Sequence, residues 1–596
     1  MKITIPTDWS PQERWVWKKL VKGEEADFNV EPEWGGLLFA RHDEGWSDKR
    51  TITPKFLETI LLTSPYKEAI HRNGVRIVGA WFKGGINLSN SKIEHLLYLD
   101  KCRFDKNVSF WDIKSASLIS FSGSRFKGEL DLHRADIASS LFLRDNALFD
   151  GEVNLASASI GGILTMKGST FTDKVDMNML KVTSNLFMGG KAQFEGEVNL
   201  LGASIGGQLA MVGSTFTGEV VMNMLKVTSS LFMSDKAQFE GEVNLVSASI
   251  GGALTMEGST FKRKVVMERV TVGGNCIISG AEFTGLVDMS FAKIKSGVLN
   301  LADASFASLN LTGAKVDGVV CLGSKTQGAT KWKKGATLTL RGAECGSLQD
   351  LEKSWPDKLD LDGFKYNRLD GFMPKDDDLF ANRGEEWMKD WLNKNEGKIF
   401  YPQPYEQLAK VLRETGQKDK ANEILLAGKQ EERKNMRKYS LAWFSLFLQD
   451  ATVGYGLRLR YTLGWALAFT FLGVFVLYVA GYVGMLVKDT SAKGTIARET
   501  IVRVKAAEKV VKGKVIGEAV VKETVVKETL VKEKPIEIID IFIFSASKLL
   551  PILRIETVDI PLDPYSKGYF LIHSILGYVL AAFLASGLAG FMKKLT

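Results

Sequence analysis

A repeating pattern of large apolar residues dominates the first half of the chain and leaves few folds open to it. Three blocks that begin at Phe149, Phe194 and Phe239 are nearly identical and recur every 45 residues. Within them the apolar residues alternate at steps of six and five, so that four steps span 22–23 residues. A unit of this length cannot bury its apolar face alone and must stack on its neighbours. The pattern therefore predicts a solenoid.

Three columns of like residues run through these repeats. One column holds phenylalanine at every position, a second holds mostly Leu and Met, and a third holds Ile and Val. A small residue often stands two positions before the large one, which leaves room for it inside a coil with four corners. Stacked coils would place like residues about 4.8 Å apart. The phenylalanine column, which implies eleven coils, consists of Phe82, Phe104, Phe126, Phe149, Phe171, Phe194, Phe216, Phe239, Phe261, Phe283 and Phe306.

On these residues the chain resembles the pentapeptide-repeat family over about residues 75–325. The resemblance implies a right-handed, four-sided β-helix, although that family steps by five throughout and this chain alternates six and five. Some members of the family mimic DNA. Acidic and basic residues nearly balance over residues 82–322, so we expect no DNA mimicry and no nucleic-acid partner. Ser115 interrupts the apolar column, which predicts one irregular coil, and a further coil is expected after residue 325.

The period changes to helical after about residue 371. Pro402 and Pro404 begin a segment in which Leu408 and Leu412 share one face, and Gly416 follows as a turn. This arrangement predicts a helical hairpin that acts as a packing collar. At the other end of the solenoid, the tryptophan-rich residues 1–65 are expected to form a cap over the first coil.

Two long apolar runs stand near the C-terminus. Tyr461–Val487 carries no charge. Tyr569–Met592 contains no Lys, Arg, Asp or Glu, and its one histidine is His573. Each run is long enough to cross the hydrocarbon layer of a bilayer, so two transmembrane helices are expected, at 461–487 and 567–592. No secretory signal peptide is visible at the N-terminus.

Basic residues precede the first predicted span. The positive-inside rule places such residues in the cytoplasm, which predicts a bacterial inner-membrane protein with both termini cytoplasmic. Contact with anionic lipid headgroups is a further expectation for these side chains. They are Arg433, Lys434, Arg437, Lys438, Arg458 and Arg460.

The region between the spans resembles the pore loop of small two-helix ion channels. Residues 536–555 are apolar but short, which is typical of a re-entrant or interfacial segment. Small residues recur every four positions in the second span and indicate close helix packing, and hence a homo-oligomer. The alternative is a two-helix anchor that conducts nothing. The pore candidates are Asp540, Ser545, Ser547, Lys548 and Pro551, and the helix-packing candidates are Gly577, Ala581, Ala585 and Ala589.

Two further segments limit this interpretation. Thr452–Gly456 matches the potassium-channel filter sequence letter for letter, but it precedes the first span, so residues 441–460 are expected to form an interfacial helix and a turn. Apolar pairs recur every five residues between Val510 and Val531. That period leaves a β-rich insertion, a solenoid turn and a disordered tract all open.

Enzyme functions find little support in the sequence. The Gly pairs recur at solenoid corners rather than in a nucleotide-binding loop, the five histidines are scattered, and the methionine column around Met188 and Met211 suits core packing better than metal binding. We therefore expect no enzyme activity, no cofactor and no metal. The order of solenoid, helix pair and membrane pair is similar to bacterial proteins labelled membrane-associated oxidoreductases, which keeps that activity as an alternative.

The sequence thus predicts a mainly β protein in which a cytosolic solenoid, a sensing or binding platform for an unknown protein or ligand, is coupled to an oligomeric pore in membrane lipid. The first alternative is a non-conducting, membrane-anchored scaffold. The expected units are a cap (1–65), a solenoid (66–370), a helical collar (371–440), an interfacial helix and turn (441–460), a first span (461–487), a charged insertion (488–535), a re-entrant or interfacial segment (536–555) and a second span (567–592).

Overall fold

The computed structural model divides the chain into two compact units, Met1–Ala427 and Gly428–Thr596. The described residues are 4–369, 380–394, 400–456, 459–483, 485–488, 502–511, 514–524, 533–550, 557 and 559–592.

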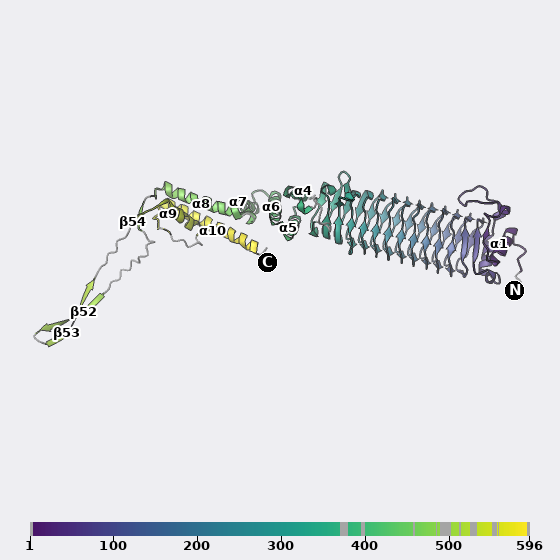
Figure 1. Ribbon diagram of the computed structural model, residues 1–596, viewed down its shortest axis with the longest axis horizontal. Helices are drawn as coiled ribbons and strands as arrows, with labels where there is room; N and C mark the ends of the chain where they lie inside the picture. Colours follow the sequence, from purple (N-terminus) through teal and green to yellow (C-terminus); the bar gives the residue numbers. More distant parts are fainter. Residues whose placement is uncertain are drawn as a thin grey trace. The chain divides into compact units, whose positions relative to one another are not determined.

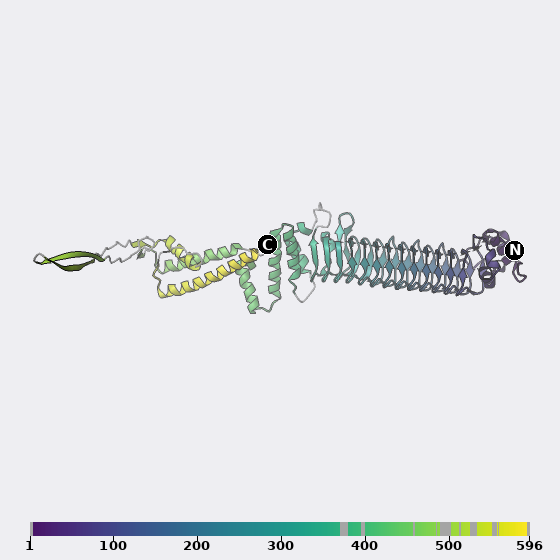
Figure 2. The ribbon, with the colours of Figure 1, turned by 90° about the horizontal axis from the view of Figure 1, so that it is seen from below.

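A parallel β-solenoid of about 13 coils makes up most of the first unit (Figures 1 and 2). Each regular coil contributes four two-residue strands, and each strand pairs in parallel with its equivalent in the next coil. This pairing confirms the stacked, four-sided coil that the sequence period predicts. One coil consists of β15 (Leu148–Phe149), β16 (Val153–Asn154), β17 (Ser159–Ile160) and β18 (Leu164–Thr165), which pair with β19 (Thr170–Phe171), β20 (Val175–Asp176), β21 (Lys181–Val182) and β22 (Leu186–Phe187).

The phenylalanine column forms the core of the solenoid. From Phe82 to Phe306 the rings stack in register, with centroids 4.3–5.1 Å apart and planes within 15° of one another. The small residues before them, such as Ala147 and Ala192, are fully buried, as expected. Met188 and Met211 are also fully buried, so these methionine side chains fill the core.

Glycine recurs at one corner of the coil because two backbones approach closely there. A Cβ atom on Gly161 would overlap the carbonyl oxygen of Ala138 in the preceding coil, and the same overlap would occur at Gly206 and Gly251. These positions therefore require glycine for stacking, which explains the recurring Gly pairs of the sequence.

The solenoid continues past residue 325, as expected. The added strands are β47 (Thr337–Thr339), β48 (Glu344–Gln349), β49 (Lys358–Asp360) and β50 (Lys365–Arg368). The irregular coil expected at Ser115 is wrong, because Ser115 pairs in register between Ile93 and Ile137. Its buried hydroxyl donates to the carbonyl of Ser117 at 2.9 Å, so the serine satisfies its own polar group within the turn.

The N-terminal residues close the first coil. The cap contains α1 (Pro11–Val21) and α2 (Pro54–Leu62), and β1 (Ala26–Asp27) pairs with β2 (Val75–Val78). Arg50 is fully buried in it and donates to the carbonyls of Trp34 at 2.8 Å and Phe28 at 3.1 Å, to that of Gly36, and to the Asn29 side chain at 2.8 Å. One guanidinium thus satisfies several buried acceptors of the cap.

Helices close the other end of the solenoid. Gln403 and Gln407 stand one turn apart on α5 (Gln403–Glu414), and their side-chain amides donate to the carbonyls of Phe364 at 3.0 Å and Tyr366 at 2.7 Å. Two backbone carbonyls at the open edge of the last coil thereby gain hydrogen-bond donors, and the end of a solenoid needs such a cap. The neighbouring helices are α4 (Glu385–Asn393) and α6 (Lys418–Asn435), and the last residues of α6 belong to the second unit.

The second unit is mainly helical. In it α8 and α10 lie side by side, and α9 packs on both (Figures 1 and 2). Its helices are α7 (Leu441–Val453), α8 (Leu459–Val479), α9 (Ile538–Leu549) and α10 (Pro564–Met592).

The two predicted membrane spans are not found as such. Within the described ranges, no helix combines the length and the apolar character that crossing a membrane would need. The first predicted span, 461–487, also does not coincide with one helix, because α8 ends at Val479 and Gly481 adopts a left-handed turn with φ +78°.

The insertion 488–535 contains β structure where the structure describes it. Two antiparallel pairs occur, β51 (Leu486–Lys488) with β54 (Glu533–Pro535), and β52 (Val502–Val511) with β53 (Lys514–Thr524). The sequence left a β-rich insertion, a solenoid turn and a disordered tract open, and the described residues form β structure.

Replacing one ring of the phenylalanine column should destabilise the solenoid. Phe194→Ala leaves a cavity between the rings of Phe171 and Phe216, which should lower the free energy of unfolding by about 3–5 kcal/mol. Phe187→Ala is the matched control, because Phe187 lies on the outer face of the preceding coil and is only half-buried. Denaturant unfolding measures both, and equal losses would contradict the stacked core.

Candidate functional site

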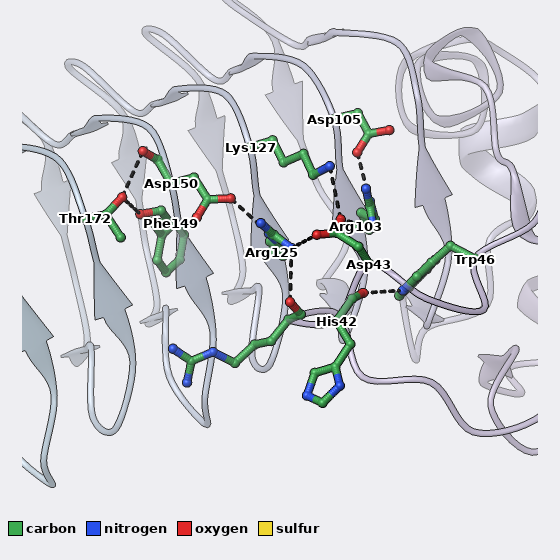
Figure 3. Close-up of polar contacts among 11 residues, drawn as sticks. His42, Asp43, Trp46, Arg103, Asp105, Arg125, Lys127, Phe149, Asp150 and Thr172 are labelled. Carbon is green, nitrogen blue, oxygen red and sulfur yellow. Dashed lines mark hydrogen bonds and ion pairs between the residues drawn. The ribbon is translucent and has the colours of Figure 1, made fainter.

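A cluster of charged side chains links the cap to the outer face of the solenoid. Asp43, in the loop between β1 and α2, receives three cations: Arg103 Nη1 at 2.9 Å, Arg125 Nη1 at 3.2 Å and Lys127 Nζ at 3.2 Å. Figure 3 shows the cations converging on this one carboxylate. We call these four residues the Asp43 cluster.

The solenoid register creates the need for this carboxylate. Arg103 and Arg125 are direct partners in adjacent strands, so their like charges are stacked. Each has its own counterion, since Arg103 Nε lies 2.9 Å from Asp105 and Arg125 Nε lies 2.9 Å from Asp150. Asp43 bridges the two remaining guanidinium edges, which are largely buried.

The same loop reaches further along the solenoid. Arg41 donates to the Asn146 side chain at 3.0 Å and to the Thr170 hydroxyl at 2.7 Å, and its carbonyl accepts from Arg125 at 3.0 Å. Contacts from residues 41–43 therefore fall on four successive coils, which carry β7 (Arg103–Phe104), β11 (Arg125–Phe126), β15 and β19. The loop acts as a strap that holds the cap to the solenoid.

The three cations change the acidity of Asp43. The hydrogen bond from Lys127 and the charge of Arg125 lower the pKa of the Asp43 carboxyl from 3.8 to about 2. The carboxylate is therefore ionised at every physiological pH, and the strap is not a pH switch in that range.

The second unit has its own polar cluster, at the junction of three helices. The Ser545 hydroxyl on α9 donates to the Thr470 carbonyl on α8 at 2.9 Å. His573 on α10 is buried, with Nε2 3.2 Å from the Ser545 carbonyl and Nδ1 3.3 Å from the Tyr569 hydroxyl. We call Thr470, Ser545 and His573 the helix-junction cluster, and each of its members has a hydrogen-bond partner.

Two glycines allow the helices to meet at this junction. A Cβ atom on Gly473 would overlap the Ser545 hydroxyl, and one on Gly577 would overlap the carbonyl oxygen of Leu549. Gly577 was predicted to pack helices between copies of the chain. In the structure it packs α10 against α9 within one chain.

The structure places the two charged pore candidates at opposite ends of α9. Asp540 lies in the first turn of α9, where its carboxylate accepts from the Glu537 backbone at 3.0 Å, and Lys548 lies in the last turn with its ammonium 5.2 Å from the Phe544 ring centroid. About 12 Å of helix separates these two charges. The Ser547 hydroxyl donates to the Phe544 carbonyl at 2.8 Å, only Ser545 joins the helix-junction cluster, and Pro551 lies outside the described residues.

The remaining helix-packing residues do not form one buried stripe. Ala581 is half-buried, Ala585 is exposed, and the side chain of Ala589 lies outside the description. Among the residues of this stripe whose side chains are described, Gly577 is therefore the one that makes a close helix contact.

The predicted basic residues divide into paired and exposed ones. Arg433 pairs with Asp450 at 2.9 Å and Lys434 with Glu431 at 2.6 Å, whereas Arg437 and Lys438 are exposed. Arg458 and the side chain of Arg460 lie outside the described residues.

The described residues offer no group of three or more His, Cys, Asp or Glu side chains that could hold a metal ion. All four cysteines are buried with free thiols. Burial raises the pKa of Cys276 and Cys345 to about 12, so these two thiols stay protonated and unreactive at neutral pH.

The Asp43 cluster was not predicted, although part of its signal is present in the sequence. Arg103 and Arg125 occupy equivalent positions 22 residues apart in the repeat, so two stacked cations are readable from the period. The acid that bridges them lies some 60 residues earlier in a non-repeating loop, and no local pattern points to it.

Removing the charge of Asp43 should release the strap. Asp43→Asn should speed hydrogen exchange and proteolysis of residues 35–50 at neutral pH, because the stacked arginines lose their shared counterion. The carboxylate has a depressed pKa, so its contribution to stability is complete above pH 3.8 and is lost as the pH falls towards 2. The difference between wild type and variant should therefore vanish over that interval.

Glu44→Gln is the control for this experiment, because Glu44 is the exposed neighbour in the same loop. Identical exchange rates in the Asp43 and Glu44 variants would refute the strap.

The close approach at Gly577 gives a matched pair of substitutions. Gly577→Ala should separate α9 from α10 and lower the melting temperature of the second unit, because its Cβ meets backbone that cannot move aside. Gly568→Ala, on the same helix, meets nothing within 4 Å and should be neutral or stabilising by up to about 1 kcal/mol. Thermal unfolding followed by circular dichroism tests both substitutions. An unchanged melting temperature in Gly577→Ala would contradict the close approach of α9 and α10.

Comparisons with protein-family models, with curated proteins and with solved structures find no match to this chain. A function for the protein is therefore proposed from the geometry of its two units.

Proposed function

We propose that the protein is a membrane-anchored scaffold of the bacterial inner membrane, in which the second unit is embedded in lipid and the solenoid is a rigid binding platform on the cytoplasmic side. We further propose that the solenoid is right-handed and related to the pentapeptide repeats. The observation that carries the membrane proposal is the exposed apolar surface of α8 and α10.

That surface is large for a water-soluble helical unit. Leu463 and Phe471 on α8 are 61% and 60% exposed, and Leu571 and Ile572 on α10 are 66% and 60% exposed. Contiguous apolar surface of this kind marks a protein or membrane contact. Further exposed apolar side chains on the two helices are Leu467, Leu472, Phe475, Tyr478, Ile575, Tyr578 and Val579.

The interior of the unit also suits a lipid environment. The helix-junction cluster satisfies its polar groups within the protein, which burial in hydrocarbon demands. The basic residues Arg437 and Lys438 stand exposed just before α7, as expected for residues on the cytoplasmic side. Tyr461 and Trp465, near the start of α8, are residue types typical of the lipid–water boundary.

An ion-conducting oligomer is the second candidate, favoured by the helix-junction cluster. An ionisable residue inside an apolar helical unit is a functional candidate by default, and His573 is buried between helices. Because two long helices cannot enclose a conduit alone, this candidate requires several copies of the chain.

Flotation of the full-length protein with phospholipid vesicles tests the membrane proposal. The wild type should float, and Leu463→Ser with Phe471→Ser should weaken partitioning by roughly a hundredfold, because two exposed apolar side chains contribute about 3 kcal/mol or more. Met179→Ser with Met224→Ser is the control, since both methionines are exposed on the solenoid. Wild-type protein that stays in the aqueous fraction would disprove the proposal.

Ion flux through the same vesicles separates the two candidates. Flux whose selectivity changes in Lys548→Glu would indicate a pore. Silence in vesicles that carry inserted protein would favour the scaffold alone.

A further inference from the structure

A groove in the second unit combines one ion pair with aromatic walls. It is an open groove of about 610 Å³, lined by residues of α6, α7 and α8, among them Arg433, Phe447, Asp450, Tyr461, Gly464 and Trp465. Its volume falls in the range of small-molecule sites. Glycine at position 464 leaves that part of the wall without a side chain.

The two charges of the groove form a neutral pair. Arg433 Nη1 lies 2.9 Å from Asp450 Oδ2, and both side chains are about three-quarters buried. The guanidinium carbon lies 5.8 Å from the ring centroid of Phe447. Among the described residues, neither charged side chain makes a further hydrogen bond, so Arg433 has N–H groups and Asp450 has an oxygen available to a ligand.

The rest of the lining is apolar and continues into exposed apolar surface. Trp465 donates its indole N–H to the Ala451 carbonyl at 2.8 Å, which fixes the ring in the wall. On the same helix Leu463 and Leu467 are exposed. A ligand that fits would therefore carry both charges at one end and an apolar chain at the other.

We propose that this groove binds the headgroup of a zwitterionic phospholipid with a primary ammonium, of the phosphatidylethanolamine class. The phosphate pairs with Arg433, the ammonium donates to Asp450, and the start of the acyl chains lies against the aromatic wall. The inference rests on the proposed function, because it requires the second unit to meet lipid.

The charges of the site set its selectivity. A net anionic headgroup such as phosphatidylglycerol satisfies Arg433 but meets the repulsion of Asp450. A quaternary ammonium, as in phosphatidylcholine, has no N–H to donate to Asp450 and keeps only the weaker charge attraction.

Binding of short-chain phospholipids to the full-length protein in mild detergent, followed by native mass spectrometry, tests this inference. The wild type should retain phosphatidylethanolamine about tenfold better than phosphatidylcholine or phosphatidylglycerol, since one charge-assisted hydrogen bond is at stake. Asp450→Asn should shift the preference to phosphatidylglycerol. Arg433→Gln should lose both, and Arg437→Gln, an exposed neighbour, should change nothing.

A double variant guards against misfolding. Arg433→Gln with Asp450→Asn removes both charges yet retains a hydrogen-bonding pair of similar size, and it should keep the helical circular-dichroism signal while losing all headgroup preference. Equal retention of the three lipids by wild type would overturn the inference, as would loss of preference in Arg437→Gln.

The flotation experiment separates this failure from failure of the proposed function. Protein that floats with vesicles of every composition but shows no headgroup preference retains its membrane role without this site. Protein that floats with none of them contradicts both.

Discussion

In-register stacking of identical side chains is the interaction on which the solenoid depends. A two-residue strand has almost no stability of its own, and four of them per coil leave much backbone in turns. Each strand is held because its equivalents lie one coil above and below, with the phenylalanine rings in contact along the whole column. The core is therefore continuous along the stack, and no coil has a separate core of its own. Stability of such a fold is a sum over neighbouring contacts, which makes the two ends its weakest points.

The ends show how a stack of this kind is closed. At the N-terminal end a buried arginine, Arg50, gathers carbonyls that would otherwise lack donors, while the Asp43 strap ties the cap to coils beyond the first. At the C-terminal end Gln403 and Gln407 do the equivalent work from one face of a helix. The two glutamines occupy carbonyls of the last coil that a strand from another molecule could otherwise pair with.

The second unit follows a different rule. Its helices approach closely where Gly473 and Gly577 leave space for α9, and the polar groups of the helix-junction cluster bond within the unit. Many large apolar side chains of α8 and α10 are exposed, whereas those of the solenoid columns are buried. This contrast between the units underlies the proposal of a platform joined to a lipid-embedded anchor.

The repeat period alone determined the coil, its inward columns and the corner glycines, because each of these features recurs at fixed spacing and each copy confirms the last. Helix positions in the collar followed from local periodicity in the same way. The length of the apolar runs predicted two membrane spans, but where a helix ends is decided by turns such as that at Gly481, which apolar content does not reveal.

Only the tertiary structure decided the contacts between residues that do not repeat. Asp43 meets Arg103 and Arg125, Gln403 meets the last coil, and Ser545 meets Thr470 across long stretches of chain. Gly577 was selected from the sequence as a packing residue, yet its partner turned out to be α9 of the same chain. A single sequence records which residue types are present at such positions. It does not record their partners, because these pairings depend on how the folded chain brings distant segments together.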